Sequence, residues 1–272
     1  MSNRVGGGFG HWGALFCGMD SGLYAAYTGL MARTQALDTA ANNLANAGTG
    51  GFRAERDYFR GVLEDGSVAD PGMASQVGGS VNGFGVLGGN RLDLSQGDLA
   101  KTGNPLDVAL RGDGFFAIQA AGGKTLYTRD GSFSLSPSGV LQTAHGEPVL
   151  DAQGKSMMMP TGTVRISGDG SVSVSTADGN SAIVGRIGVF KFADKSSLHA
   201  ESAGRLSVDA TAKPVASDAL MEQGSVEGSN EDAVHGTMQL VLVQRQAEMM
   251  QKALSVFNNE FDKTAVEDLG RV

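Results

Sequence analysis

The two ends of the chain carry apolar residues at the spacing of an amphipathic helix. Near the N-terminus the gaps between apolar positions alternate between four and three residues, which places them in one seam of a helix. This register consists of Leu23, Tyr27, Leu30, Thr34, Leu37, Ala41 and Leu44. A matching register near the C-terminus consists of Leu240, Val243, Ala247, Met250, Leu254, Phe257 and Phe261. Both run close to 3.5 residues per turn, so we predict terminal helices that pair as a coiled-coil-like domain.

The N-terminal helix also has a second stripe, made of small residues that permit close approach of another helix. This stripe consists of Ala25, Ala32, Ala36 and Ala40. A helix that is apolar on more than one side must bury more than one side. Two interpretations follow: a core helix of an ordinary globular domain, or a helix that packs against several neighbours in an assembly.

Between the two helical patterns, short runs of alternating apolar and polar residues are separated by turn signals. Asp130-Gly131 and Asp169-Gly170 are Asp-Gly pairs of the kind that favour tight hairpin turns. Frequent short strands predict an antiparallel all-β body.

The predicted fold is therefore α+β, a mainly antiparallel β body with N- and C-terminal α-helices. We expect a flexible leader (1–18), an N-terminal helix (19–47), an extended connector with short strands (48–103), the β body (104–210), a return linker (211–230) and a C-terminal helix (231–272). Ser229 is a candidate cap of the last helix, with Asp232 three residues on.

Composition and charge narrow the class of protein. The 21 basic and 29 acidic side chains give a net charge of −8, which disfavours nucleic-acid binding and a polybasic membrane anchor. The 41 glycines fit many tight turns, and the single cysteine, Cys17, allows no disulfide within the chain. The sequence shows no apolar run long enough for a transmembrane helix and no convincing cleaved signal peptide.

The sequence offers little catalytic chemistry. The four histidines are widely spaced, no group of residues has metal-ligand spacing, and a nucleophile elbow and a phosphate-binding loop are both missing. Residues 112–117 fit the pattern G-x-G-x-x-A, but a strand rather than a helix is predicted to follow, so we interpret them as a turn. We therefore predict no catalytic, cofactor or metal site, and a protein that is not an enzyme.

Several segments resemble the bacterial flagellar axial proteins of the rod and hook. Residues 42–53, Asn-Asn-Leu-Ala-Asn-Ala-Gly-Thr-Gly-Gly-Phe-Arg, are similar to the signature A-N-N-[LI]-A-N-x-x-T-x-G-[FY]-[KR] of that family. Residues 102–107 and 112–116 match its T-G-N-P-L-D and G-D-G-F-F segments, and residues 127–133 match Y-T-R-x-G-x-F. Residues 223–230 resemble Q-G-x-L-E-x-S-N, with Val226 in place of the usual Leu. The resemblance covers essentially residues 19–272, so Met19 is an alternative start.

The resemblance implies a structural subunit of the flagellar rod. Such a subunit passes through the flagellar type III export apparatus without a cleaved signal peptide and polymerises helically with itself and other rod and hook subunits in the periplasm. It transmits motor torque, and no nucleic-acid partner or membrane insertion is implied. Size and residues 52–55 favour the proximal rod subunit over a distal-rod or hook-type subunit. A β-rich surface or carbohydrate-binding module is the alternative outside this family, although aromatic residues for a binding platform are few.

Within this interpretation the two terminal registers are the assembly surfaces. The predicted assembly residues are Leu23, Tyr27, Leu30, Leu37, Asn42, Asn43, Leu44, Asn46, Leu240, Val243, Ala247, Met250, Leu254, Phe257 and Phe261. We expect the three asparagines to cap the helix end or to make polar contacts between subunits. We expect Gly48, Gly50 and Gly51 to let the backbone turn away after the helix.

Overall fold

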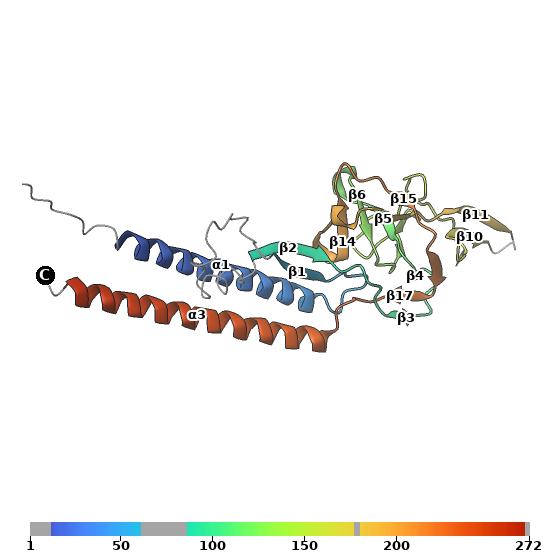
Figure 1. The fold of residues 1–272 in the computed structure, drawn as a ribbon. Helices are drawn as coiled ribbons and strands as arrows, with labels where there is room; N and C mark the ends of the chain where they lie inside the picture. Colours follow the sequence, from blue (N-terminus) through green and yellow to red (C-terminus); the bar gives the residue numbers. More distant parts are fainter. Residues whose placement is uncertain (1–11, 61–85, 177–179, 270–272) are drawn as a thin grey trace, which may run out of the picture. The chain divides into compact units, whose positions relative to one another are not determined.

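The computed structural model describes residues 12–60, 86–176 and 180–269. It divides the chain into two compact units (Figure 1). One, the terminal unit, comprises Met1–Ala41, Asp57–Asn90 and Thr237–Val272. The other, the β unit, comprises Asn42–Arg56 and Arg91–Gly236.

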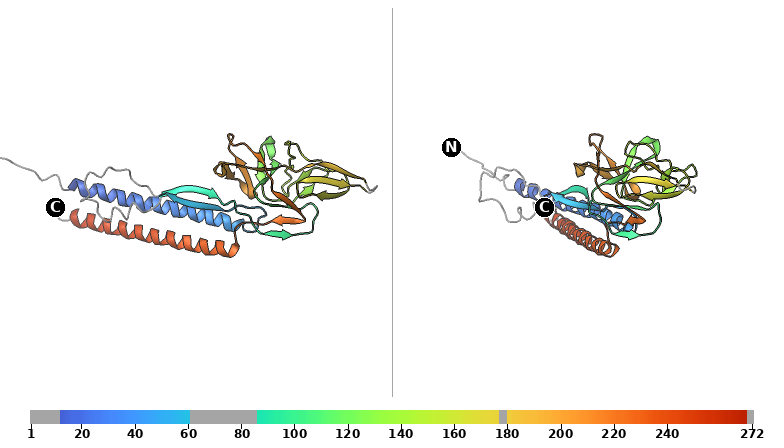
Figure 2. Two further views of the ribbon diagram at one scale, coloured as in Figure 1. Left: turned by 45° about the vertical axis from the view of Figure 1, so that its right-hand side comes forward. Right: turned by 90° about the vertical axis from the view of Figure 1, so that its right-hand side faces the viewer.

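The terminal unit contains most of two long helices, α1 (Trp12–Ala45) and α3 (Ala233–Leu269), which run side by side in Figures 1 and 2. Helix α1 begins at Trp12, before the predicted start at residue 19, and ends at Ala45. Within the predicted leader, Trp12–Gly18 is helical because its two glycines are outnumbered by residues that tolerate a helix, such as Ala14 and Leu15. Neither helix, within its described residues, is long and apolar enough to cross a membrane.

The start of α3 differs from the prediction in its capping residue. The carboxylate of Asp232 accepts a hydrogen bond of 2.8 Å from the backbone N–H of His235, in the first turn of the helix. This is the contact of an N-cap. The hydroxyl of Ser229 instead accepts from the backbone N–H of Glu231, ahead of the helix. The predicted cap at Ser229 was therefore wrong, and Asp232 itself is the cap.

The strands confirm a mainly antiparallel β architecture. After the first helix, strand β1 (Glu55–Arg60) pairs with strand β2 (Val86–Leu92). The largest sheet has six strands in the order β13-β14-β6-β5-β12-β15. Its strands are β5 (Phe115–Gln119), β6 (Thr125–Thr128), β12 (Val189–Lys191), β13 (Leu198–Ala200), β14 (Arg205–Val208) and β15 (Val215–Ala216). Because β5 follows Gly112-Asp113-Gly114 directly, those residues form a turn before a strand, as predicted.

The other strands of the β unit form smaller sheets. A three-stranded sheet has the order β11-β10-β9, from β9 (Thr163–Ile166), β10 (Ser171–Ser175) and β11 (Ser181–Arg186). The pairs are β16 (Leu220–Gln223) with β4 (Val108–Arg111), β17 (Ser225–Glu227) with β3 (Leu99–Lys101), and β7 (Ser134–Leu135) with β8 (Leu141–Gln142).

Residues 211–230 were expected to be a linker, but they contribute three of these strands. Strands β15, β16 and β17 pair with β12, β4 and β3, respectively. Each has only two to four residues, too few to establish a period of two in the sequence. The segment thus closes the β unit instead of only returning the chain to the last helix.

The core of the β unit consists of two apolar clusters. The larger surrounds Phe116, whose ring meets that of Phe133 edge-on with centroids 5.1 Å apart. The smaller surrounds Tyr127, whose ring lies 4.8 Å from that of Phe192 in the same arrangement. Neighbouring residues of β5 face different clusters because side chains alternate along a strand. This core fixes the segments that carry the family motifs.

Candidate functional site

A buried charge cluster joins three segments that are far apart in the sequence. Glu227, at the end of β17, is fully buried. One of its carboxylate oxygens, Oε1, accepts from Nη2 of Arg53 and, at 2.9 Å, from the backbone N–H of Gly97. Its second oxygen, Oε2, accepts from Nη1 of Arg129 at 3.0 Å. We call Arg53, Arg129 and Glu227 the buried triad.

The two arginines of the triad have further partners. Nη2 of Arg129 donates to the carbonyl of Gly112 at 2.6 Å, and its guanidinium lies 5.3 Å from the ring centroid of Phe115. Nη1 of Arg53 donates to the carbonyl of Phe52 at 2.9 Å. Burial lowers the pKa of Arg53, Glu227 opposes that effect, and Arg129 adds to it. Both guanidiniums stay charged because an arginine is not deprotonated in a protein, so two buried cations share one carboxylate.

Two asparagine side chains hold the chain on either side of the triad. The amide of Asn43 forms two hydrogen bonds with the backbone of Glu55: Nδ2 donates to the carbonyl at 2.8 Å and Oδ1 accepts from the N–H at 2.9 Å. Oδ1 of Asn230 accepts from the N–H of Ala54 at 2.8 Å, and its Nδ2 donates to the carbonyl of Asp93 at 2.7 Å. The last turn of α1 and the residues ahead of α3 are thereby fastened within one unit.

The other two asparagines have different surroundings. Nδ2 of Asn46 donates to the carbonyl of Asn42 at 3.0 Å, and that carbonyl also accepts from the backbone N–H of Asn46 at 3.1 Å, at the end of α1. The side chain of Asn42 is exposed. Asn46 therefore bonds to the last turn of α1, as expected of a residue at a helix end, whereas the amide of Asn43 makes a contact within the chain that was not expected.

Of the three exit glycines, Gly51 is the one in a left-handed conformation, with φ of +66°. A β-carbon there would lie 2.2 Å from the main-chain nitrogen of Asp130, so only glycine fits this approach. A β-carbon on Gly48 would meet no atom within 4 Å. Gly48, Gly50 and Gly51 all lie in the turn that follows α1, as expected, but of the three only Gly51 has a positive φ.

A second, more exposed charge network lies beside the triad. Arg56 forms ion pairs with Asp93 at 3.6 Å and with the buried Glu231 at 3.1 Å. Burial alone would raise the pKa of Asp93. Hydrogen bonds from Ser95 and the positive charge of Arg56 outweigh that effect, so the pKa of Asp93 lies below its ordinary value.

The predicted helix positions differ in exposure. In α3, Ala247 and Leu254 are buried, while Leu240, Val243 and Met250 are half-buried. In α1 the seam is less covered: Leu30, Leu37 and Leu44 are half-buried and Tyr27 is 46% exposed. The buried side chains of α1 include the small stripe Ala32, Ala36 and Ala40. The side chains of Leu23, Phe257 and Phe261 lie outside the described residues.

The carboxylate at the centre of this arrangement is fully occupied by contacts within the fold. Each oxygen of Glu227 is occupied by a cation or a backbone N–H, so the carboxylate is not free to accept a proton from a substrate. Within the described ranges, no group of His, Cys, Asp and Glu has the arrangement of a metal site.

The buried triad was not predicted, although its residues lie in the quoted motifs. Arg53 and Glu227 are 174 positions apart, and Arg129 and Glu227 are 98 apart. The available signal was Glu227 itself, a lone charge between small residues in Ser225-Val226-Glu227-Gly228. A charge in such a short strand is buried only when it is paired, but the sequence does not identify the partner.

Comparisons with known proteins match both units. A family model described as flagella basal body rod protein matches residues 23–53, and one described as the flagellar hook protein FlgE/F/G D1 domain matches residues 109–174. The chain is 35% identical to the flagellar basal-body rod protein FlgF of Caulobacter vibrioides over 258 residues, covering 93% of this chain and 100% of the relative. It is 36% identical to FlgF of Mesorhizobium japonicum, covering 84% and 89%, and 31% identical to FlgG of Bacillus subtilis, covering 82% and 89%.

Proposed function

Because this chain belongs to the family of flagellar basal-body rod proteins, we propose that its terminal helices pair as a coiled-coil-like domain and assemble with those of neighbouring subunits into a helical rod. The chain is a structural subunit of the flagellar basal body, and its relatives named FlgF favour the proximal rod. The observation that carries the proposal is the presence of two opposite apolar stripes on α3.

The first stripe is the predicted C-terminal register. Along α3 these positions are buried or half-buried, whereas their polar neighbours Gln244, Glu248 and Gln251 are exposed. A β-carbon added to Gly29 of α1 would lie 3.4 Å from the terminal methyl carbon of Met250. This close approach supports pairing of α1 and α3 within one chain.

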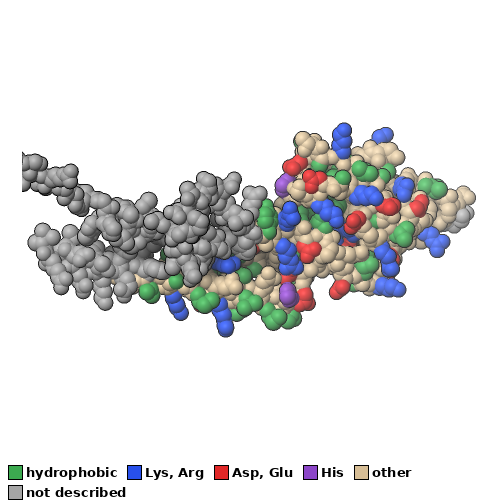
Figure 3. All heavy atoms as spheres, viewed as in Figure 1, with side chains coloured by type: hydrophobic (Ala, Val, Ile, Leu, Met, Phe, Trp, Pro, Cys, Tyr) green, Lys and Arg blue, Asp and Glu red, His purple; other side chains and the backbone are tan. Residues whose placement is uncertain are grey.

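The second stripe faces solvent and consists of Val234, Met238, Val241, Leu242, Met249 and Val256, which are 46–69% exposed. At about 100° per residue these side chains lie on the side of α3 opposite the first stripe. Three of them, Leu242, Met249 and Val256, recur every seven residues, as in a helix–helix seam. Figure 3 shows apolar side chains along the coloured part of this helix.

An apolar stripe of this length favours coverage by another helix. Fully burying one such side chain contributes roughly 1.5–3 kcal/mol, so several together supply a large part of the free energy of an interface. If a different surface of the next copy covers the stripe, the contact is heterologous. Heterologous contacts that do not close into a ring generate helical polymers.

We further propose how the subunit is exported and where it is located. The subunit is exported unfolded by the flagellar type III apparatus, takes its place in the periplasmic rod and transmits torque to the hook. It binds no nucleic acid and inserts no segment in a membrane. The net charge of −8 supports the absence of nucleic-acid binding. The ion pairs of the buried triad support a β unit that is stiff enough to transmit torque.

A substitution on the second stripe tests the proposal. Leu242→Asp changes a side chain that is 60% exposed, so we expect the isolated chain to keep its thermal stability and to fail to enter basal bodies. Gln246→Asp adds the same charge at an exposed position outside the stripe and is the matched control. Basal bodies purified from cells that express each variant would be compared by immunoblot. Normal incorporation of Leu242→Asp would contradict the proposed assembly surface.

A further inference from the structure

The outward face of the three-stranded sheet β9-β10-β11 differs from the rest of the β unit. Its inward face supplies Val164, Ile166, Val172 and Val174 to the core. On the outward face the strand register places Arg165, Ser173 and Ile183 in one row across the sheet. Neighbouring rows place Thr163, Ser175 and Ser181 together, and Ser171 opposite Arg186.

Small hydroxyl side chains cover most of this face. They project little above the sheet, so three longer side chains stand out: Arg165, Ile183 and Arg186. Ile183 is 80% exposed, the highest value among the large apolar side chains of the described residues. An exposed apolar anchor beside arginines is typical of a protein-binding surface, where Arg is enriched.

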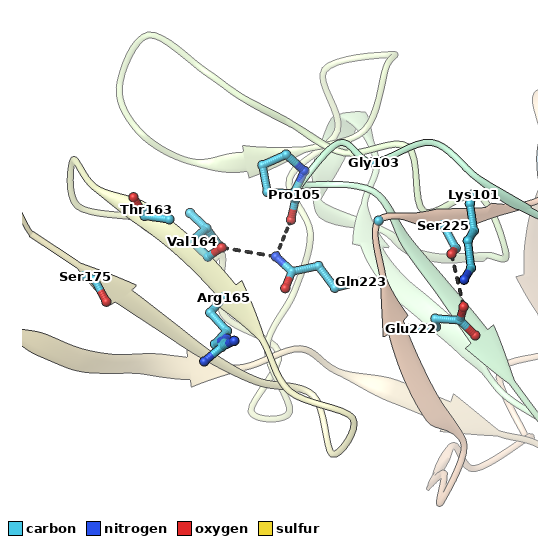
Figure 4. A pocket seen from close by; sticks show the side chains of 11 residues that line it. Lys101, Gly103, Pro105, Thr163, Val164, Arg165, Ser175, Glu222, Gln223 and Ser225 are labelled. Atoms are coloured by element: carbon cyan, nitrogen blue, oxygen red, sulfur yellow. Dashed lines mark hydrogen bonds between the residues drawn. The ribbon is translucent and has the colours of Figure 1, made fainter.

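The strands of this face also carry cations on an acidic protein, and Asp169, in the turn between β9 and β10, lies near Arg186. None of its three strands contains an Asp or Glu, while the whole chain has a net charge of −8. Lys101 and Arg165 line an adjoining groove, which is shown in Figure 4. The carboxylate in that groove, Glu222, is already paired with Arg111 at 2.8 Å. The cations of this face therefore complement the prevailing charge of the chain itself.

The two edge strands of the sheet, β9 and β11, differ in what lies beside them. At β9, the side chain of Gln223 mimics a neighbouring strand: Nε2 donates to the carbonyl of Val164 at 3.1 Å (Figure 4). Its Oε1 accepts from the N–H of Ile166 at 3.2 Å. At β11, the order of the described sheet ends without a further strand. The edge that carries Ile183 is thus the open one, where a strand edge presents backbone groups for a partner.

From these observations we infer that the outward face of β9-β10-β11 binds an acidic surface on a second copy of this chain. The inference rests on the proposed rod assembly, in which copies meet at high local concentration. The contact is heterologous, because a cationic face is attracted to an acidic surface and is repelled by the same cationic face on another copy. It is therefore compatible with helical growth and adds a β-unit contact to the one made by the helices.

Site-specific photo-cross-linking in assembled basal bodies tests this inference. A photoreactive phenylalanine analogue would replace Ile183 in the full-length chain, in cells that lack the native copy. The control position is Met158, an apolar residue of the same unit that is 66% exposed. We expect a cross-linked homodimer from position 183 at least fivefold stronger than from position 158. Equal yields, no homodimer, or a product with a different protein would each overturn the inference.

Charge reversal provides the second measurement. We expect the double variant Arg165→Glu and Arg186→Glu to lower the homodimer yield at least fivefold. Lys155→Glu and Lys213→Glu together change the net charge equally at exposed positions elsewhere and should leave the yield unchanged. The melting temperature of each variant would be measured in parallel, with Arg165→Glu alone as the milder change. Absence of the chain from basal bodies would contradict the proposed function as well, whereas incorporation without a homodimer contradicts this inference alone.

Discussion

Removing the charge of Glu227 is the most direct test of the buried triad. In Glu227→Gln the side chain keeps its shape and can still accept from Gly97, but two buried guanidiniums lose their shared counter-ion. Breaking a buried ion pair by removing one partner costs about 3–5 kcal/mol, because an uncompensated charge remains in the interior. We expect a loss of this size in the stability of the β unit.

The loss converts to a change in melting temperature. For a unit of about 160 residues, 1 kcal/mol shifts the midpoint by about 2–4 °C. Glu227→Gln should therefore lower the midpoint by about 6–20 °C, followed by circular dichroism in the strand band. Glu222→Gln is the matched control, because its ion pair with Arg111 is exposed, with side-chain accessibilities of 33% and 65%. Exposed pairs contribute about 0–1 kcal/mol.

A double-mutant cycle separates charge from packing. If charge is the cause, Arg53→Met should cost clearly less in the Glu227→Gln background than in the native chain, because the uncompensated cation is then removed. Coupled neighbours show interaction energies of about 0.5–3 kcal/mol. A midpoint for Glu227→Gln equal to that of Glu222→Gln, or additive effects in the cycle, would refute the reasoning.

Three further predictions concern the surroundings of the triad. Gly51→Ala should destabilise the β unit by more than 1 kcal/mol in urea unfolding, because the new β-carbon would meet the nitrogen of Asp130 at 2.2 Å, whereas Gly48→Ala should change it by less than about 1 kcal/mol. Asn230→Ala should cost about 1–3 kcal/mol in the same assay, because two backbone groups lose a partner. The lowered pKa of Asp93 stabilises the fold above about pH 4 and this contribution is lost as the pH falls through the folded-state pKa, so Asp93→Asn should flatten the decline of melting temperature on acidification.

Each of these has a clear contrary result. Equal urea midpoints for the two alanine variants would show that the turn relaxes around a side chain at position 51. An unchanged midpoint for Asn230→Ala would mean that water replaces the amide. The same acid dependence with and without Asp93 would place the responsible carboxylates elsewhere.

The architecture was largely predictable because its signals are local. Heptad spacing and Asp-Gly turns identified two terminal helices and an antiparallel β body between them. Strands β15, β16 and β17 were missed because strands of two to four residues are defined by partners distant in the chain. Asp232 rather than Ser229 as the cap is a shift of three residues, within the usual uncertainty of helix ends that are predicted from a sequence.

The candidate site was predictable in location but not in chemistry. Residues 42–53 were identified as the end of a helix, and α1 does end at Ala45, where the amide of Asn46 bonds to the carbonyl of Asn42. The amide of Asn43, however, bonds to Glu55 across a turn, and Arg53 reaches Glu227 through the fold. Such contacts produce no recognisable spacing in the sequence, because the number of residues between the two partners can vary without changing the contact.

The separation of the partners in the triad sets the order in which the chain can complete its fold. Closing a loop of 174 residues is entropically slow, and it requires Glu227 to be available. A chain threaded N-terminus first presents Arg53 and Arg129 long before their counter-ion. Until Glu227 emerges, burying those guanidiniums is unfavourable, and β3 and β4 also lack their partners β17 and β16. The position of one carboxylate near the C-terminus thus ties completion of the β unit to the availability of the chain as far as Glu227.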